Sequence, residues 1–157
     1  MAVAKEMIAD RKDKLTNHPW RKEAMTVTQV GILACCGEEC LGGTISRLAT
    51  RRVMETLRPN HAVTLCLPLY IAGGEEERSF AQEYPVITVE GCSKCCATCA
   101  TEKYSGKVHE TINIETILGK EIAQSKIVST RDLNEEHKDM IKTISREICS
   151  KLDAIIS

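Results

Sequence analysis

Eight of the nine cysteines in the chain fall in three short stretches, each of which follows a predicted β-strand. Cysteine thiolates bind zinc and iron–sulfur clusters, and they also act as redox nucleophiles. The pattern therefore predicts one metal or redox site that is built from segments far apart in the sequence. The three stretches contain Cys35, Cys36 and Cys40; Cys66; and Cys92, Cys95, Cys96 and Cys99.

The third stretch is the densest, because its four thiols follow Gly91 at positions i, i+3, i+4 and i+7. On an α-helix of 3.6 residues per turn, these positions lie on a single face. We expect a helix over residues 92–104 that directs four soft ligands to the same side.

Length and composition favour a functional role for these cysteines. A chain of 157 residues with 43% apolar content can bury a core of its own, so it needs no metal merely to fold. The 21 basic and 22 acidic residues leave a formal charge of −1, which provides no electrostatic footprint for DNA or RNA. We therefore expect no nucleic-acid partner.

The sequence also favours a cytoplasmic protein without a membrane partner. No apolar stretch approaches the roughly 20 residues that are needed to cross a bilayer. The charged residues at positions 10–14 interrupt the apolar core that a signal peptide would require. In a reducing cytoplasm, clustered cysteines are more often metal ligands or catalytic thiols than disulfides, and the odd number of cysteines agrees with this expectation.

The elements that carry the cysteines form three consecutive strand–loop–helix units. Apolar, β-branched runs predict the strands, and glycine-containing loops lead into the helices. This order predicts a three-layer α/β fold with a mostly parallel sheet and helices on both faces. The expected strands are 27–34, 62–67 and 86–89, and the expected helices are 44–57 with Thr44 as N-cap, 75–84 and 92–104.

The rest of the chain completes a single domain over residues 1–157, in which the cysteine-bearing β-α units occupy 25–114. Residues 1–24 are predicted to form a charged helix or arm. Apolar residues at helical spacing predict a final helix over 132–156, which begins at an Asp132 or Asn134 cap. The connecting part is expected to contain a fourth strand over 108–114, a short helix over 115–122, and a strand or extended connection over 126–129.

This topology brings the three cysteine stretches together. In open parallel α/β sheets, ligands bind outside the carboxyl ends of the strands, where the strand-to-helix loops converge. The stretches are separated by roughly 30 residues, which is the length of a β-α unit. We therefore expect the thiols to meet at one end of the sheet.

Several of these segments resemble a known family. The motifs are Ile32-Leu33-Ala34-Cys35, Leu65-Cys66-Leu67-Pro68 with Gly73-Gly74, and Glu90-Gly91-Cys92 with Cys96 four residues further on. Over roughly residues 30–106, they resemble the DGC-domain family, whose members are expected to bind zinc. The resemblance implies four chelating cysteines: Cys35, Cys66, Cys92 and Cys96. Glu90 stands where the family name has Asp, and four cysteines are additional to the family set: Cys36, Cys40, Cys95 and Cys99.

Zinc is the expected metal, since a tetrahedral Zn²⁺ site can be completed by four thiolates. Such a site carries a local charge of −2, which requires positive groups nearby. We expect these from the first turns of the helices after the first and third strands, and from Lys94 and Arg47.

Two alternatives use the same residues. Four cysteine thiolates also hold a [4Fe–4S] cluster, and the additional cysteines would serve as further ligands for such a cluster or a larger one. The pairs Cys92/Cys95 and Cys96/Cys99 also have the CxxC spacing of dithiol oxidoreductases. Two adjacent pairs are unusual for a thioredoxin-type site, so we rank a metal above a dithiol.

Two classes of function follow: an accessory, carrier or sensor module that holds a metal and acts with a protein partner, and a redox or metal-dependent enzyme. No general base is evident in the sequence, which favours the first class.

The remaining cysteine, Cys149, lies beside the apolar stripe of the last helix, so we expect it to be a packing residue.

Overall fold

The computed structural model describes residues 29–37 and 39–157, so the predicted N-terminal segment 1–24 lies outside the described residues. Four strands form one sheet in the order β2-β1-β3-β4, and every pairing is parallel. The strands are β1 (Val30–Ala34), β2 (Ala62–Thr64), β3 (Val86–Glu90) and β4 (Glu110–Asn113). The predicted α/β fold with a parallel sheet is therefore confirmed.

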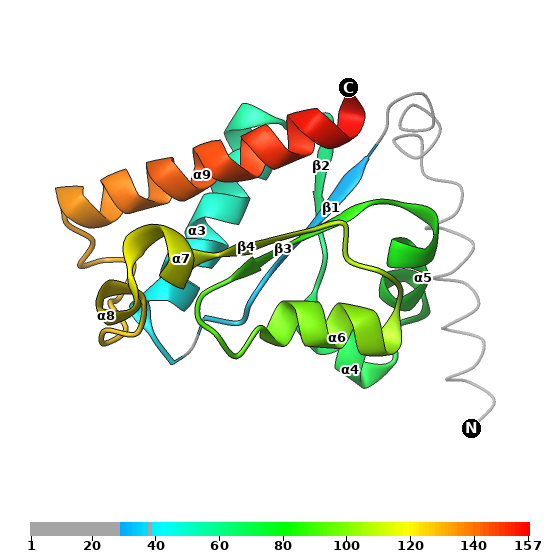
Figure 1. Ribbon diagram of the computed structural model, residues 1–157, viewed down its shortest axis with the longest axis horizontal. Helices are drawn as coiled ribbons and strands as arrows, with labels where there is room; N and C mark the ends of the chain where they lie inside the picture. Colours follow the sequence, from blue (N-terminus) through cyan, green and yellow to red (C-terminus); the bar gives the residue numbers. More distant parts are fainter. Residues whose placement is uncertain (1–28, 38) are drawn as a thin grey trace, which may run out of the picture.

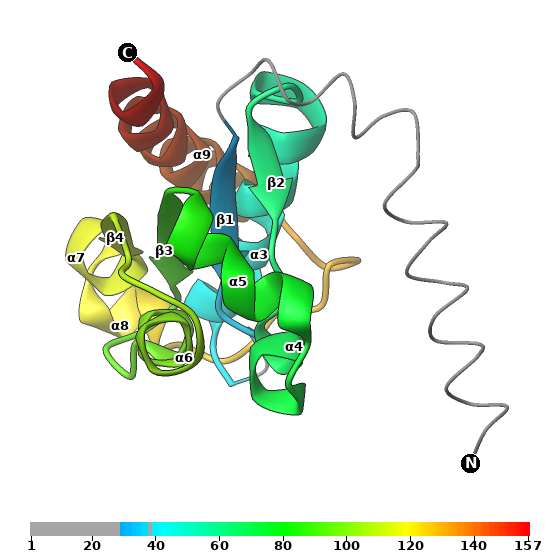
Figure 2. The ribbon, with the colours of Figure 1, turned by 90° about the vertical axis from the view of Figure 1, so that its right-hand side faces the viewer.

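Helices cover both faces of this sheet. Figures 1 and 2 show α3 and α9 on one side and α4 and α6 on the other. No helix in the described part of the chain is long and apolar enough to cross a membrane. The helices are α3 (Leu41–Arg52), the π-helix η2 (Val53–Leu57), α4 (Leu67–Ala72), α5 (Glu75–Glu83), α6 (Cys96–Tyr104), α7 (Ile114–Leu118), α8 (Lys120–Ala123) and α9 (Glu135–Ile156).

The two faces have separate apolar cores because successive strand residues point to opposite sides. In the larger core, Ile32 of β1 and Ile87 of β3 pack with Ile45 of α3 and Ile148 of α9. Cys149 is also buried in this core, as predicted. The smaller core lies under α4 and α6 and consists of Leu33, Leu67, Tyr70, Ala97 and Ala100.

The last helix, α9, begins directly after Asn134, which is one of its two predicted N-cap residues. The Asn134 side chain accepts a hydrogen bond from the backbone N–H of His137, and the His137 ring accepts one from the Asn134 backbone N–H. This reciprocal pair satisfies two backbone donors that a helix start would otherwise leave unpaired.

Two predicted boundaries are wrong. α3 begins at Leu41 with Cys40 as its N-cap, so Thr44 lies inside the helix. The predicted strand over 62–67 ends at Thr64, and Cys66 becomes the N-cap of α4. Pro68 lies in the first turn of α4. Backbone N–H groups in a first turn have no partner within the helix, so proline, which lacks an N–H, is tolerated there.

Between β4 and α9, one further prediction fails and another loses one of its two alternatives. The helix expected over 115–122 is split into α7 and α8 at Gly119, whose φ of 89° does not fit a right-handed helix. Of the strand or extended connection predicted over residues 126–129, the strand does not form, and the segment is a connection without regular secondary structure. The preceding carbonyl, that of Ser125, instead accepts a hydrogen bond from the Leu41 N–H at 3.0 Å, which ties this connection to the start of α3.

Candidate metal centre

Three of the cysteines lie at the carboxyl ends of three adjacent strands. Cys35 directly follows β1, while Cys66 and Cys92 each lie two residues beyond the end of their strands, β2 and β3. Because β1 lies between β2 and β3 in a parallel sheet, these strands end at the same edge. The topology thus brings the three cysteine stretches to one end of the sheet, as expected.

Glycines allow the cysteine-bearing segments to touch through their backbones. A Cβ atom added to Gly42 would lie 2.1 Å from the Gly91 carbonyl oxygen, and one added to Gly43 would lie 2.2 Å from Cα of Gly37. Gly37 also has a φ of 75°, a conformation that favours glycine. The start of α3 therefore packs directly against the loops that carry Cys35 and Cys92. Sequence reasoning placed these glycines in a loop and missed this contact.

Cys35 occupies a buried and polar position. Its Sγ lies 3.4 Å from Oγ of Ser46, and its side chain is 9% exposed. Burial raises the pKa of the Cys35 thiol, while its hydrogen bond with Ser46 and those with the backbones of Gly91 and Gly37 act in the opposite direction. Several polar groups thus surround one buried sulfur, and hydrogen bonds of this kind orient a ligand side chain.

The burial of Cys35 leads to a test of thiol reactivity. In metal-free protein at neutral pH, we expect a small alkylating reagent to modify exposed Cys36 and Cys66 before buried Cys35 and Cys149. The raised pKa of Cys35 slows its reaction further, because the thiolate is the reactive form. Timed alkylation with peptide mass spectrometry measures this order. Modification of Cys35 as fast as Cys66 would contradict the buried placement.

The third stretch is not a continuous helix. α6 begins at Cys96, so the prediction that four thiols share one helix face is wrong. Among the described residues, Cys95 is the single non-glycine with a positive φ, and its φ of 50° and ψ of 47° interrupt the helix. Cys92 and Cys95 therefore lie in a loop closed by a 3.3 Å hydrogen bond from the Cys95 N–H to the Cys92 carbonyl, whereas Cys96 and Cys99 belong to α6.

Thiols of the first and third stretches lie close enough to influence one another electrostatically. Burial raises the pKa of both Cys96 and Cys95, and nearby thiolates and Glu90 raise them further. A cation placed among these sulfurs would reverse that effect, because it favours the ionised thiols. The thiols involved are Cys35, Cys36, Cys92, Cys95, Cys96 and Cys99.

The thiols are not arranged in a finished coordination shell. Within residues 29–37 and 39–157, no three cysteine, histidine or carboxylate side chains lie close enough to hold a metal ion as they stand. Cys36, Cys66, Cys96 and Cys99 are exposed, and exposed side chains change rotamer readily. The thiol donors suit a soft metal ion in their chemistry, and binding one would require these side chains to move closer together.

The expected positive groups lie beside the site, but one helix end does not contribute. Lys94 forms an ion pair with Glu39, which links the third loop to the first and raises the pKa of Lys94. Arg47 lies against Gly37, because a Cβ added to Gly37 would lie 2.9 Å from Nε of Arg47.

At the start of α6, however, the carboxylate of Glu90 already accepts hydrogen bonds from the first-turn amides. The positive end of this helix is therefore neutralised, which corrects the expectation that it offsets the thiolates.

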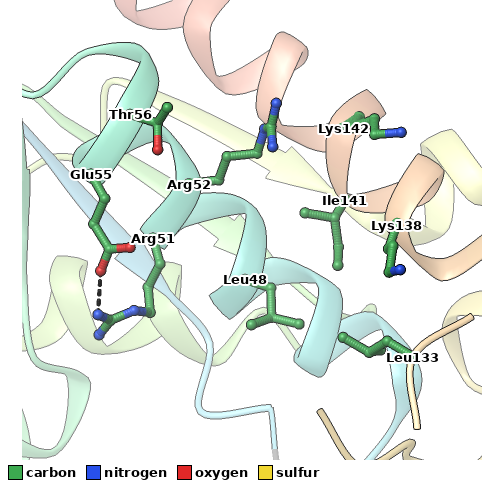
Figure 3. Close-up of a pocket in the computed structure, with 9 residues that line it drawn as sticks. All are labelled: Leu48, Arg51, Arg52, Glu55, Thr56, Leu133, Lys138, Ile141 and Lys142. Atoms are coloured by element: carbon green, nitrogen blue, oxygen red, sulfur yellow. Dashed lines mark hydrogen bonds and ion pairs between the residues drawn. The ribbon is translucent and has the colours of Figure 1, made fainter. Parts of the chain in front are cut away.

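A surface pocket of about 430 Å³ lies elsewhere, between the carboxyl-terminal half of α3 and the start of α9 (Figure 3). The residues that line it include no cysteine, so it is separate from the thiol site. Three of its four cations are paired with carboxylates, namely Arg51 with Glu55, Lys138 with Glu135 and Lys142 with Asp139. Its lining consists of Leu48, Arg51, Arg52, Glu55, Thr56, Leu133, Lys138, Ile141 and Lys142.

Comparison with known proteins identifies the family. The family model of the DGC domain matches residues 31–144, which includes all eight clustered cysteines and extends beyond the segment that carries the sequence motifs. No curated protein and no solved structure matches the chain. Because the family match covers most of the sequence, the chain belongs to the DGC domain family.

Proposed function

We propose that the protein is a metal-binding accessory, carrier or sensor module that holds zinc through cysteine thiolates. The observation that carries this proposal is the meeting of three cysteine-bearing loops at the ends of adjacent strands, two of them joined through glycine backbones. A sheet edge with many thiols and no disulfide among the described residues offers the soft donors that zinc prefers.

The primary ligands in this proposal are Cys35, Cys66, Cys92 and Cys96. Cys35 and Cys92 lie on the loops that pack together, and Cys96 begins the adjoining helix. Cys66 is exposed at the start of α4, beyond the neighbouring strand. Zinc with four thiolates has no open coordination position, so this ligand set suits storage, delivery or sensing better than catalysis. Delivery or sensing also implies a protein partner.

An iron–sulfur cluster is the second candidate, and the additional thiols support it. Cys36, Cys95 and Cys99 lie in the same loops and helix start as the primary set, while Cys40 is buried at the N-cap of α3. More than four thiols at one sheet edge exceed what a single zinc ion requires. A cluster would make a redox or enzymatic role the better proposal.

A dithiol oxidoreductase is less well supported. Catalytic thiols of that class have a lowered pKa, because the thiolate is the nucleophile. Burial and the surrounding negative charges instead raise the pKa of Cys95 and of Cys96. This direction favours a site that ionises when a metal arrives.

Anaerobic purification followed by elemental analysis and a visible spectrum distinguishes these proposals. We expect stoichiometric zinc and a colourless protein. Iron with acid-labile sulfide and a brown chromophore would instead establish the cluster. A folded protein that contains and binds neither metal under these conditions would contradict both metal-binding proposals.

A further inference from the structure

Glu90 is a carboxylate that is buried beside the thiols without being a proposed ligand. It is the last residue of β3, and its side chain is 1% exposed. Its Oε1 accepts hydrogen bonds from the Thr98 N–H at 2.6 Å and from the Thr98 hydroxyl at 2.8 Å, and its Oε2 accepts one from the Ala97 N–H at 3.3 Å. Three donors of α6 thus converge on one carboxylate.

These contacts cap α6 from a different element. A helix start leaves its first amides unpaired, and the residue at the N-cap usually satisfies them with its own side chain. The N-cap of α6 is Cys95, whose side chain makes no such hydrogen bond. Glu90 satisfies the second and third amides of α6 instead, so the Cys95 thiol is not used for capping.

The hydrogen bonds of Glu90 also close the loop that carries the thiols. At its start, Gly91 packs against the backbone of Gly42 and Gly43, which holds this end of the loop to α3. At its end, Glu90 reaches across the loop to Ala97 and Thr98, so both ends are held by residues that are not proposed ligands.

A cluster of threonine hydroxyls fixes the same helix start to the sheet. Oγ1 of Thr98 lies 2.8 Å from that of Thr88 on β3 and 3.3 Å from that of Thr111 on β4, and the latter two are 3.0 Å apart. The Thr98 hydroxyl donates to Glu90, so the carboxylate ends this chain of hydrogen bonds. The start of α6 is thereby joined to two strands.

From this geometry we propose that Glu90 is a positioning residue, which holds the loop from Cys92 to Cys96 in the arrangement that receives the metal. The inference rests on the proposed zinc-binding function. Its physical basis is that groups that orient a ligand loop before binding reduce the ordering required when the metal arrives. Loss of such supporting hydrogen bonds typically lowers metal affinity by about 10- to 100-fold.

The test compares Glu90→Gln with Glu102→Gln in the full chain. Both variants replace a glutamate by its amide, but Glu102 is exposed on the same helix. Glutamine keeps one acceptor oxygen and turns an N–H₂ donor toward a backbone N–H, so it cannot reproduce the contacts of Glu90. Zinc affinity is measured by competition with a chromophoric chelator. Hydrogen exchange of the zinc-free protein reports on the Ala97 and Thr98 amides.

We expect Glu90→Gln to lower zinc affinity by about 10- to 100-fold and to reduce protection of the amide that faces the new N–H₂ group, while Glu102→Gln matches the wild type in both. Glu90→Asp retains a charged acceptor and should recover most of the affinity. If Glu90→Gln does not fold, Thr98→Val removes a single donor to the carboxylate and should produce a smaller loss in the same direction.

The outcomes separate this inference from the function on which it rests. If the wild type binds zinc and Glu90→Gln binds it equally tightly although the amide that lost its acceptor exchanges faster, Glu90 is only a helix cap and the positioning role is refuted. If Thr98→Val is the variant that folds, unchanged zinc affinity refutes it in the same way. A wild-type protein that binds no zinc would overturn the proposed function together with the inference.

Discussion

Replacing Cys92 by serine should weaken zinc binding strongly. In the proposed site, this change deletes one of four thiolates, and a neutral hydroxyl is a poor substitute for a soft anionic sulfur. A structural zinc site has an apparent binding free energy of about 10–16 kcal/mol. If each of the four ligands contributes about a quarter, the loss of one ligand costs roughly 3 kcal/mol, which lowers the affinity about a hundredfold. Chelator competition and elemental analysis measure the loss.

Cys149→Ser provides the matched control for this prediction. It makes the same chemical change at a thiol that is buried in the core under α9, so zinc occupancy should stay at the wild-type level. Equal losses at both positions would show that occupancy follows general stability and would refute the ligand assignment. Serine at Cys36, Cys40, Cys95 or Cys99 tests the size of the site, since losses as large as that at Cys92 would indicate more than one zinc ion.

The meeting of the three cysteine stretches at one end of the sheet was predictable because it depends on local sequence patterns. Apolar runs followed by glycine-containing loops predicted three strands, and the parallel order predicted that Cys35, Cys66 and Cys92 follow their carboxyl ends. These inferences require only the periodicity of each segment and the general behaviour of β-α units.

The local geometry of the thiols was not predictable in the same way. Helical spacing of the cysteines in the third stretch predicted a helix from Cys92, but the left-handed backbone at Cys95 delays α6 to Cys96. A left-handed conformation at a non-glycine residue is costly and persists where surrounding contacts hold it, so spacing alone does not reveal it. The role of Glu90 was hidden for a related reason, because its hydrogen-bond partners are defined only once the helix start is known.

The glycines at the start of α3 were misread because their contacts are with distant segments. Gly42 and Gly43 look like loop residues, since glycine weakens a helix interior. In the structure they are buried helical residues, and their missing side chains let α3 approach Gly37 and Gly91. Packing against the nearby Gly37 loop and against Gly91, which is about 50 residues away, overrides the local propensity.

This packing predicts that Gly43→Ala lowers the stability of the protein. At an exposed position within a helix, the same change raises the stability of the helix by about 1 kcal/mol. The new Cβ would lie 2.2 Å from Cα and 2.9 Å from the carbonyl carbon of Gly37, and neither backbone atom can move without the loop. Forcing an extra methyl group into a packed interior costs about 1–3 kcal/mol, so the net free energy of unfolding should fall. Denaturant unfolding of the zinc-free protein measures this change.

Zinc affinity should fall as well, because the displaced loop carries Cys35 and Cys36 next to Gly37. Gly74→Ala is the matched control, since its new Cβ would meet mainly the movable carboxylate of Glu77, at 2.5 Å. That carboxylate can rotate away, so we expect a change in stability of less than about 1 kcal/mol and unchanged zinc affinity. Stability of Gly43→Ala at or above the wild-type level would contradict the close backbone packing of α3 against the Gly37 loop, which carries Cys35 and Cys36.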